Sequence, residues 1–244
     1  MNFPVYFSLF SLRIHPHILF ESVAYAVAFR LMLRNVKQDE IAPSQRTSII
    51  VGGMIGALVG AKLLVVLQHI DLIWQWQQLL WLLLQGKTVV GALLGGLIGV
   101  ELTKKLIGVK SSTGDVFVYP LIVGTAIGRI GCFLTGLSDR TYGTPTTLPW
   151  GIDFGDGILR HPTQLYEILF LIILILFLQL RSRYRHQLGD LFKFYLICYL
   201  GFRFLIDFIK PDFHPIFGMS AIQGACLLAL VFYRRHIIKL FLFR

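Results

Sequence analysis

The sequence predicts an all-α membrane protein with seven transmembrane helices, an N-terminus outside, a cytoplasmic C-terminus, and an additional helix at the membrane interface. Hydrophobic residues make up 55% of the 244 residues, and the mean hydropathy is +0.69, well above the values of soluble domains. Apolar stretches close to the roughly 20 residues that span a bilayer recur along the whole chain. Lysines and arginines are concentrated in every second loop between these stretches.

Seven stretches qualify as spans, and polar or turn-forming residues separate them. In chain order they are residues 18–33, 48–68, 88–102, 116–136, 162–180, 190–209 and 217–233. The third is short and carries Gly91, Gly95, Gly96 and Gly99, which predicts close helix packing or a break. Segment 73–84 places three tryptophans among glutamines, a pattern typical of an interfacial helix. We expect residues 1–244 to form a single integral-membrane domain, with residues 137–161 as a polar loop region outside.

The net charge of +10 predicts membrane topology rather than a nucleic-acid partner. Thirteen lysines and arginines fall in one set of alternate loops and only five, at positions 13, 87, 140, 160 and 210, in the opposite set. Cytoplasmic loops carry an excess of positive charge. The richer set, which includes the loop 181–189 and the C-terminal end, is therefore expected to be cytoplasmic.

Six ionisable side chains lie inside the apolar stretches, near the end that this topology places outside. They are Glu21, Lys62, Arg129, Glu167, Arg203 and Asp207. A charge at bilayer depth costs at least about 2.5–3.5 kcal/mol, so the group predicts a polar chamber that opens toward the outer leaflet. Arg203 and Asp207 have the i, i+4 spacing of a helical ion pair. The alternative interpretation is that three internal salt bridges hold the helices together.

Two features point to binding of an anionic group. Arg129 stands between Gly128 and Gly131, and a guanidinium fork with little bulk beside it suits a phosphate or a carboxylate. A polar loop cluster, including Asp139 and Gly143, then precedes the helix start at Pro162. His161, Gln164, Tyr166 and Glu167 surround that start.

Cys132, Cys198 and Cys226 all fall inside spans and show neither metal-ligand spacing nor a disulfide pattern. Small buried side chains are the expected role of Cys198 and Cys226. For Cys132, a nucleophile and a core residue both remain open.

Three motifs carry a resemblance to a known family. They are Gly128-Arg129-Ile130-Gly131-Cys132-Phe133, the run Tyr-Gly-Thr-Pro-Thr-Thr-Leu-Pro-Trp-Gly at 142–151, and the run Arg-His-Pro-Thr-Gln-Leu-Tyr-Glu at 160–167. In order and spacing they resemble the bacterial prolipoprotein diacylglyceryl transferases. Residues 201–208, followed by Lys210-Pro211-Asp212, are similar to that family's late arginine motif.

The resemblance implies a multi-pass enzyme of the bacterial plasma (inner) membrane. Such an enzyme moves the diacylglyceryl group of phosphatidylglycerol onto the cysteine thiol in the lipobox segment of a prolipoprotein signal peptide, and releases glycerol phosphate. Arg129 and Arg203 would hold the lipid phosphate. No cofactor and no metal is expected. The residues expected to contact substrate are Gly128, Gly131, Gln164, Tyr166, Gly143, Asp207, Lys62 and Glu21.

This chain departs from the family pattern at several positions. Leu94 stands where the family has a histidine, and Cys132 and Thr135 replace asparagines. A replacement base for the acceptor thiol is therefore expected in the outer polar level: Glu167 first, then His161, then Asp139. The alternative is a non-catalytic or transport-type paralogue that binds an anionic phospholipid head group.

Overall fold

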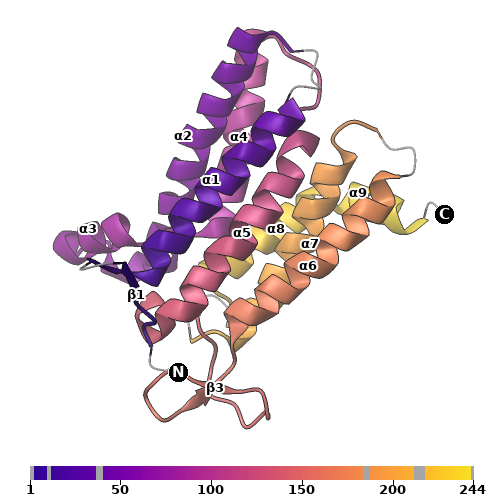
Figure 1. Cartoon of the computed structure of the whole chain (residues 1–244). Helices are drawn as coiled ribbons and strands as arrows, with labels where there is room; N and C mark the ends of the chain where they lie inside the picture. Colours follow the sequence, from indigo (N-terminus) through magenta and orange to yellow (C-terminus); the bar gives the residue numbers. More distant parts are fainter. Residues whose placement is uncertain (1–2, 10–11, 37–40, 184–186, 212–217, 243–244) are drawn as a thin grey trace. The chain divides into compact units, whose positions relative to one another are not determined.

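The computed structural model describes residues 3–9, 12–36, 41–183, 187–211 and 218–242. Within these ranges the chain is mostly helical (Figure 1), which confirms the predicted all-α class. Asp212 and Phe217, which belong to the late arginine motif and the last predicted span, lie outside the described residues. The long helices are α1 (Pro16–Val36), α2 (Pro43–Gln68), α3 (Trp76–Gln85), α4 (Val89–Ile107), α5 (Asp115–Thr135), α6 (Thr163–Ser182), α7 (Asp190–Ile206), α8 (Ala221–Phe232) and α9 (Arg234–Leu242). The short elements are strands β1 (Phe7–Leu9), β2 (Leu12–Ile14), β3 (Ile152–Asp153) and β4 (Leu159–Arg160), and 3₁₀ helices η1 (Ile70–Leu72), η2 (Gly136–Asp139) and η3 (Asp207–Ile209).

Each predicted apolar stretch contains a helix, but the helices differ in their ability to cross a bilayer alone. Among the described residues, α1, α2, α5 and α6 are long and apolar enough to do so. Helices α3 and α4 pass the same test only as a pair, with a bend of 79° between them, and α8 is apolar but shorter. Length and composition thus support four or five spans, and seven remains a prediction.

Polar and apolar side chains are distributed in the reverse of the pattern of a soluble protein. Large apolar side chains such as Leu58 and Leu176 are 63% and 55% exposed, whereas Glu167 and Asp207 are 2% and 0% exposed. Soluble monomers rarely show apolar surface on this scale. The helices therefore present their apolar faces to lipid and keep their charges inside.

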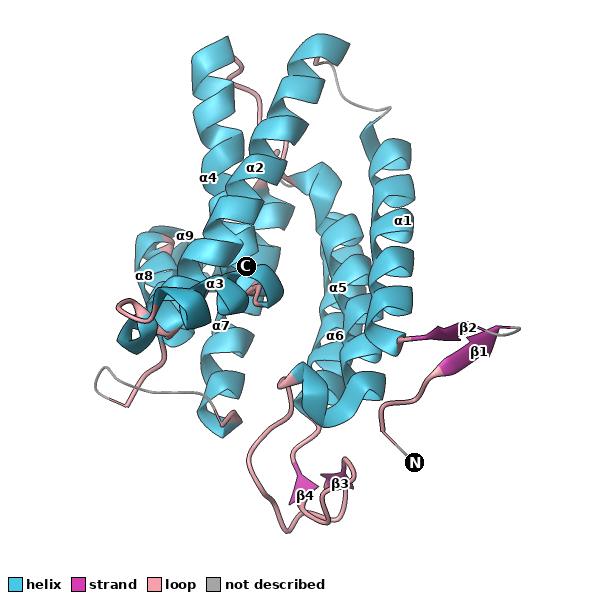
Figure 2. Ribbon diagram, turned by 90° about the vertical axis from the view of Figure 1, so that its left-hand side faces the viewer, coloured by secondary structure: helices cyan, strands magenta, loops and turns pink. Residues whose placement is uncertain are grey.

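The chain forms two compact units. The first comprises Met1–Asp39, Ser112–Cys198 and Ile209–Pro211, and the second comprises Glu40–Ser111, Tyr199–Phe208 and Asp212–Arg244. In the first unit α5 lies between α1 and α6 (Figures 1 and 2). Asp115, in the first turn of α5, accepts backbone hydrogen bonds from Gly189 and Phe192 at 2.7 and 2.9 Å. This carboxylate fixes the start of α7 to the start of α5.

The loop region between α5 and α6 is held by its own hydrogen bonds. Strands β3 and β4 pair antiparallel, with Ile152 opposite Arg160, and lie beyond the end of α5 and the start of α6 (Figure 2). The Asp153 Oδ1 accepts from the backbone N–H groups of Gly155, Asp156 and Gly157 at 2.7–3.1 Å. Backbone bonds between Thr144 and His161, and from Thr144 N–H to the Ile209 carbonyl, close the other side of the region.

The second unit is built on a close contact between α2 and α4. A methyl group added at Gly56 would collide with the Gly95 carbonyl, and one added at Gly60 would collide with the Gly91 carbonyl. The glycines therefore let the two backbones touch, as the small residues of membrane helix pairs do. The prediction of close packing in the glycine-rich segment is confirmed.

Candidate active site

A buried ion pair joins α5 to α6. Arg129 Nε lies 2.9 Å from Glu167 Oε2, and the two residues are 8% and 2% exposed. The flanking glycines play different parts: a methyl group at Gly131 would lie 2.7 Å from Phe20 Cβ, whereas Gly128 has nothing within 4 Å of that position. Gly131 thus lets α1 approach α5, and Gly128 leaves space on the helix that carries the guanidinium.

The second arginine, in the last turn of α7, pairs with the first residue of η3, which follows directly. Arg203 Nη2 lies 3.4 Å from Asp207 Oδ1, and both residues are buried, so the i, i+4 contact predicted from the sequence forms. The Ser220 hydroxyl donates a hydrogen bond to the other carboxylate oxygen of Asp207. Ser220 is also the N-cap of α8, in a capping box with Gln223. Asp207 therefore links this arginine to the start of α8, within the second unit.

A third polar cluster surrounds the start of α1. His17 Nδ1 lies 2.8 Å from Asp139 Oδ1, and His17 Nε2 lies 3.4 Å from Glu21 Oε2. Glu21 also accepts a hydrogen bond from the Tyr25 hydroxyl at 2.9 Å. The sequence reasoning included Asp139 and Glu21 but missed His17. The i, i+4 spacing of His17 and Glu21 was the one available signal.

Thr141 connects this cluster to the start of α6. Its hydroxyl donates to Asp139 Oδ2 at 2.5 Å and accepts from Gln164 Nε2 at 3.1 Å, while its carbonyl accepts from the Thr163 hydroxyl. Gln164 is 1% exposed. The predicted substrate residue Gln164 is thereby placed in the same hydrogen-bonded network as Asp139.

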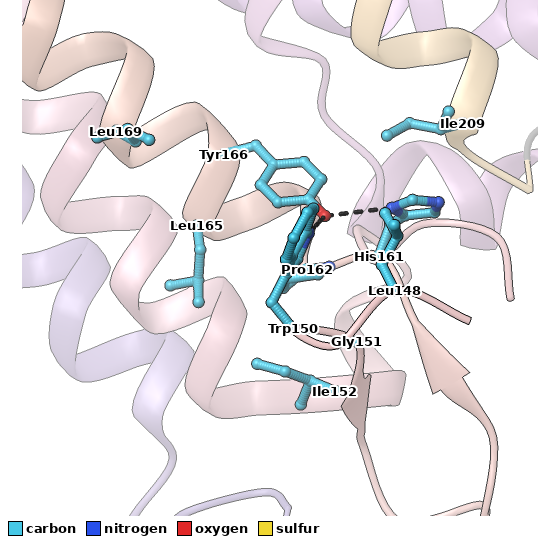
Figure 3. Close-up of a pocket in the computed structure, with 10 residues that line it drawn as sticks. All are labelled: Leu148, Trp150, Gly151, Ile152, His161, Pro162, Leu165, Tyr166, Leu169 and Ile209. Carbon is cyan, nitrogen blue, oxygen red and sulfur yellow. Dashed lines mark hydrogen bonds between the residues drawn. The ribbon is translucent and has the colours of Figure 1, made fainter. Parts of the chain in front are cut away.

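An apolar cavity of about 980 Å³ opens beside the loop region, with Tyr166 at its centre (Figure 3). The Tyr166 hydroxyl accepts from Trp150 Nε1 at 2.8 Å and lies 3.1 Å from His161 Nδ1. A methyl group at Gly143 would lie 2.6 Å from His161 Cβ, so packing explains that glycine. The lining residues are Leu148, Trp150, Gly151, Ile152, His161, Pro162, Leu165, Tyr166, Leu169 and Ile209.

Two further charged residues have local partners. Lys62, in the second unit, donates to the carbonyls of Leu83 and Gly86, the latter at 2.8 Å, and so fixes the end of α3. In the loop region the Arg160 guanidinium bonds Asp156 at 2.6 Å and lowers the pKa of that exposed carboxyl. Arg160 also lies over the Tyr142 ring, 5.1 Å from its centroid.

These features define a class: a multi-pass, all-α membrane protein with ionised side chains buried between its helices. The sequence of residues 4–241 matches the prolipoprotein diacylglyceryl transferase family. The chain belongs to this family, as the motifs had indicated.

Three relatives with this activity in their names match the chain over most of their length. A phosphatidylglycerol–prolipoprotein diacylglyceryl transferase of Clostridium tetani is 32% identical, over 86% of each chain. One from Campylobacter lari is 31% identical, over 98% of this chain and 96% of its own. One from Finegoldia magna is 29% identical, over 96% of this chain and 97% of its own.

Proposed function

We propose that this protein transfers the diacylglyceryl group of phosphatidylglycerol to the cysteine thiol of prolipoproteins. The observation that carries the proposal is the buried Arg129–Glu167 pair, which sits in two of the motifs that resemble the family. A guanidinium held by a carboxylate inside an apolar unit is oriented before substrate arrives. It is suited to the phosphodiester of a lipid that enters from the bilayer.

In this proposal Arg129 holds the lipid phosphate and stabilises the charge that develops as glycerol phosphate leaves. Arg203 is assigned a phosphate-binding role from its match to the family's late arginine motif. Charge-assisted, bidentate contacts are the strongest that a side chain makes to phosphate. Glu167 and Asp207 act as positioning residues, since each carboxylate already binds its arginine. The sequence predicted Glu167 as the first candidate for the base that deprotonates the acceptor thiol. Its ion pair with Arg129 supports a role in positioning the arginine as well.

The apolar cavity beside Tyr166 is the proposed site for the acceptor. Its walls are almost entirely apolar, and its polar groups are the His161, Trp150 and Tyr166 tips. Such a site suits the apolar segment of a signal peptide with the lipobox cysteine at its end. We place it at the outer leaflet of a bacterial plasma membrane, because the basic loops predict that the loop region faces outside.

The test uses the purified full-length chain in lipid nanodiscs with phosphatidylglycerol and a lipobox peptide. Transfer predicts that the peptide gains the mass of one diacylglyceryl group while an equal amount of glycerol phosphate is released. A serine-for-cysteine peptide is the matched control and should give neither product.

The substitutions at Leu94, Cys132 and Thr135 favour a second candidate, a paralogue that binds an anionic phospholipid without transfer. The same experiment separates the two. Phosphatidylglycerol that binds in proportion to protein, with no peptide product and no glycerol phosphate, is the result expected of the paralogue. That result contradicts the transferase.

A further inference from the structure

Three side chains able to bind a metal converge from separate parts of the first unit. His17 lies in the first turn of α1, Cys132 in the last turn of α5, and Asp139 at the end of η2. Their candidate ligand atoms all lie within 4.8 Å of one another. Zinc bonds of about 2.0–2.3 Å hold tetrahedral ligand atoms about 3.3–3.8 Å apart, so shifts of about 1 Å would close the cluster on an ion.

The residues around this cluster resemble the surroundings of a metal site. Metal-bound histidines usually donate their second ring N–H to a carboxylate, and metal-bound carboxylates accept hydrogen bonds from neighbours. His17 Nε2 lies 3.4 Å from the Glu21 carboxylate, while Nδ1 faces Asp139 and is the ring nitrogen that would bind the ion. Thr141 donates a hydrogen bond to Asp139. Both kinds of supporting contact are therefore present.

The ligand types indicate which ion fits. Imidazole, thiolate and carboxylate together suit Zn²⁺, and three protein ligands leave a fourth position for a substrate atom. The His17 and Asp139 side chains are 29% and 8% exposed, so the cluster is enclosed but accessible. The spacing of the cysteines alone offered no metal motif, because the ligands come from three separate segments.

We propose that His17, Cys132 and Asp139 bind a Zn²⁺ ion whose fourth ligand is the acceptor cysteine of the prolipoprotein. The role of the ion rests on the proposed transfer function, whereas the metal site itself does not. A thiol that binds zinc loses its proton outright, and the thiolate is the nucleophile. The ion would then do what the family's histidine, here Leu94, is expected to do.

The step balances without any further reagent. The acceptor S–H bond breaks as sulfur binds the ion, and the proton passes to solvent. The thiolate sulfur attacks the glyceryl carbon next to the phosphate, the S–C bond forms, and the C–O bond to phosphate breaks with its electron pair. Glycerol phosphate leaves and the thioether leaves the ion, which is neither oxidised nor reduced.

The position of the cluster relative to Arg129 supports this assignment. Arg129 Nη1 lies 3.7 Å from Cys132 Sγ, so the proposed phosphate-binding guanidinium adjoins a proposed metal ligand. Gln164, through Thr141, ties Asp139 to the start of α6. A thiolate on the ion and a phosphate on Arg129 would thus lie side by side, as the transfer requires.

Metal content of the purified full-length protein tests the site. After loading with Zn²⁺ and dialysis, the unmodified protein is expected to retain on the order of one ion per chain. His17→Gln, Cys132→Ser and Asp139→Asn should each lose it, and Cys198→Ser is the matched control that should keep it. Glu21→Gln should weaken zinc affinity about 10–100-fold by removing the support of His17. Equal zinc in Cys132→Ser and the unmodified protein overturns the site.

Cobalt binding to the unmodified protein tests the same site without a variant, so the result does not depend on whether a variant folds. Co²⁺ added to the unmodified protein should give a thiolate-to-cobalt charge-transfer band in the near ultraviolet, which Zn²⁺ then abolishes by displacement. Co²⁺ that binds without that band contradicts Cys132 as a ligand, and no binding at all contradicts the site.

Activity separates this proposal from the proposed function. Transfer that disappears on chelation and returns with Zn²⁺ supports both. Full transfer by the chelated protein leaves the transferase standing and overturns the role of the ion. Retained zinc with no transfer in either state leaves the metal site standing and contradicts the transferase.

Discussion

Arg129 and Glu167 lie on different helices, α5 and α6, and their side chains meet at 2.9 Å inside the first unit. Arg203, near the end of α7, instead pairs with Asp207 four residues later, at the start of η3, and Lys62 binds two backbone carbonyls. Each of these three cations thus has a partner, but the partners differ in kind. A pair between helices depends on packing, whereas a pair four residues apart depends only on spacing. Removing one member should therefore have different consequences at the two sites.

Arg129→Lys is expected to reduce transfer nearly as much as Arg129→Ala. A lysine keeps the charge but loses the planar fork that, in the proposed function, contacts phosphate through two N–H groups. The loss of one charge-assisted hydrogen bond, about 1.5–3 kcal/mol, corresponds to a reduction of about 10–100-fold in turnover. Release of glycerol phosphate measures it, with Arg30→Lys on the exposed side of α1 as the control. Full activity of Arg129→Lys would leave this residue a structural charge only.

Asp207→Leu is expected to destabilise the protein rather than to act only on catalysis. It leaves the buried Arg203 without its carboxylate, and breaking a buried pair in this way costs about 3–5 kcal/mol. Thermal unfolding in detergent should show a clearly lower Tm. Leu205→Ala, at a side chain near the end of α7 that is 67% exposed, should change the Tm much less. An unchanged Tm in Asp207→Leu would mean that Arg203 does not depend on this partner.

At the scale of elements, helices α2 and α4 pack closely because glycines line their contact. Gly56 and Gly60 face Gly95 and Gly91 across the contact, so that backbone touches backbone. Without side chains between them, the two helices gain close van der Waals contact, which is the main attraction available inside a bilayer. Any added carbon must therefore push the helices apart.

Gly56→Ala should destabilise the protein by about 1–3 kcal/mol, the usual cost of overpacking. The matched control is Gly224→Ala in α8, where the added methyl group has nothing within 4 Å. There alanine should be neutral or stabilising by about 0.5–1 kcal/mol, because it is the better helix former. Thermal unfolding of the two variants side by side measures the difference. Equal Tm values would contradict the close contact.

Sequence reasoning located the helices and the charges but not how the charges meet. Apolar length predicted a helix in every span, and the tryptophan-rich segment 73–84 forms most of α3. Spacing predicted the contact of Arg203 with Asp207, because the two residues are four positions apart and η3 directly follows α7. The pairing of Arg129 with Glu167, and the approach of His17 to Cys132 and Asp139, could not be predicted. The first depends on how α5 packs against α6, and the second on how α1, α5 and the loop after α5 pack, which no local pattern encodes.

At the scale of the whole molecule, the exposed apolar side chains and the buried charges describe a protein whose solvent is lipid. Side chains such as Met54, Leu58 and Ile173 are 67%, 63% and 58% exposed, and charges in such surroundings stay inside. The membrane also gives the chain a direction, because loop cations remain on the cytoplasmic side. Thirteen loop cations against five, alternating with every predicted crossing, predict that direction, with the loop region between α5 and α6 outside.

Labelling from outside the cell tests this orientation. Thr147 is exposed in the loop region, and Gln187 is exposed in the basic loop after α6. Each is replaced by cysteine in a separate variant. A membrane-impermeant maleimide added to intact cells should modify Thr147→Cys but not Gln187→Cys, and both should react once the membrane is opened. The unmodified protein measures the background from the native cysteines. If only Gln187→Cys reacts in intact cells, the chain is inverted, and the proposed phosphate site at Arg129 and the proposed zinc site would then serve the cytoplasmic leaflet. If both react in intact cells, the predicted number of crossings between α5 and the basic loop is wrong.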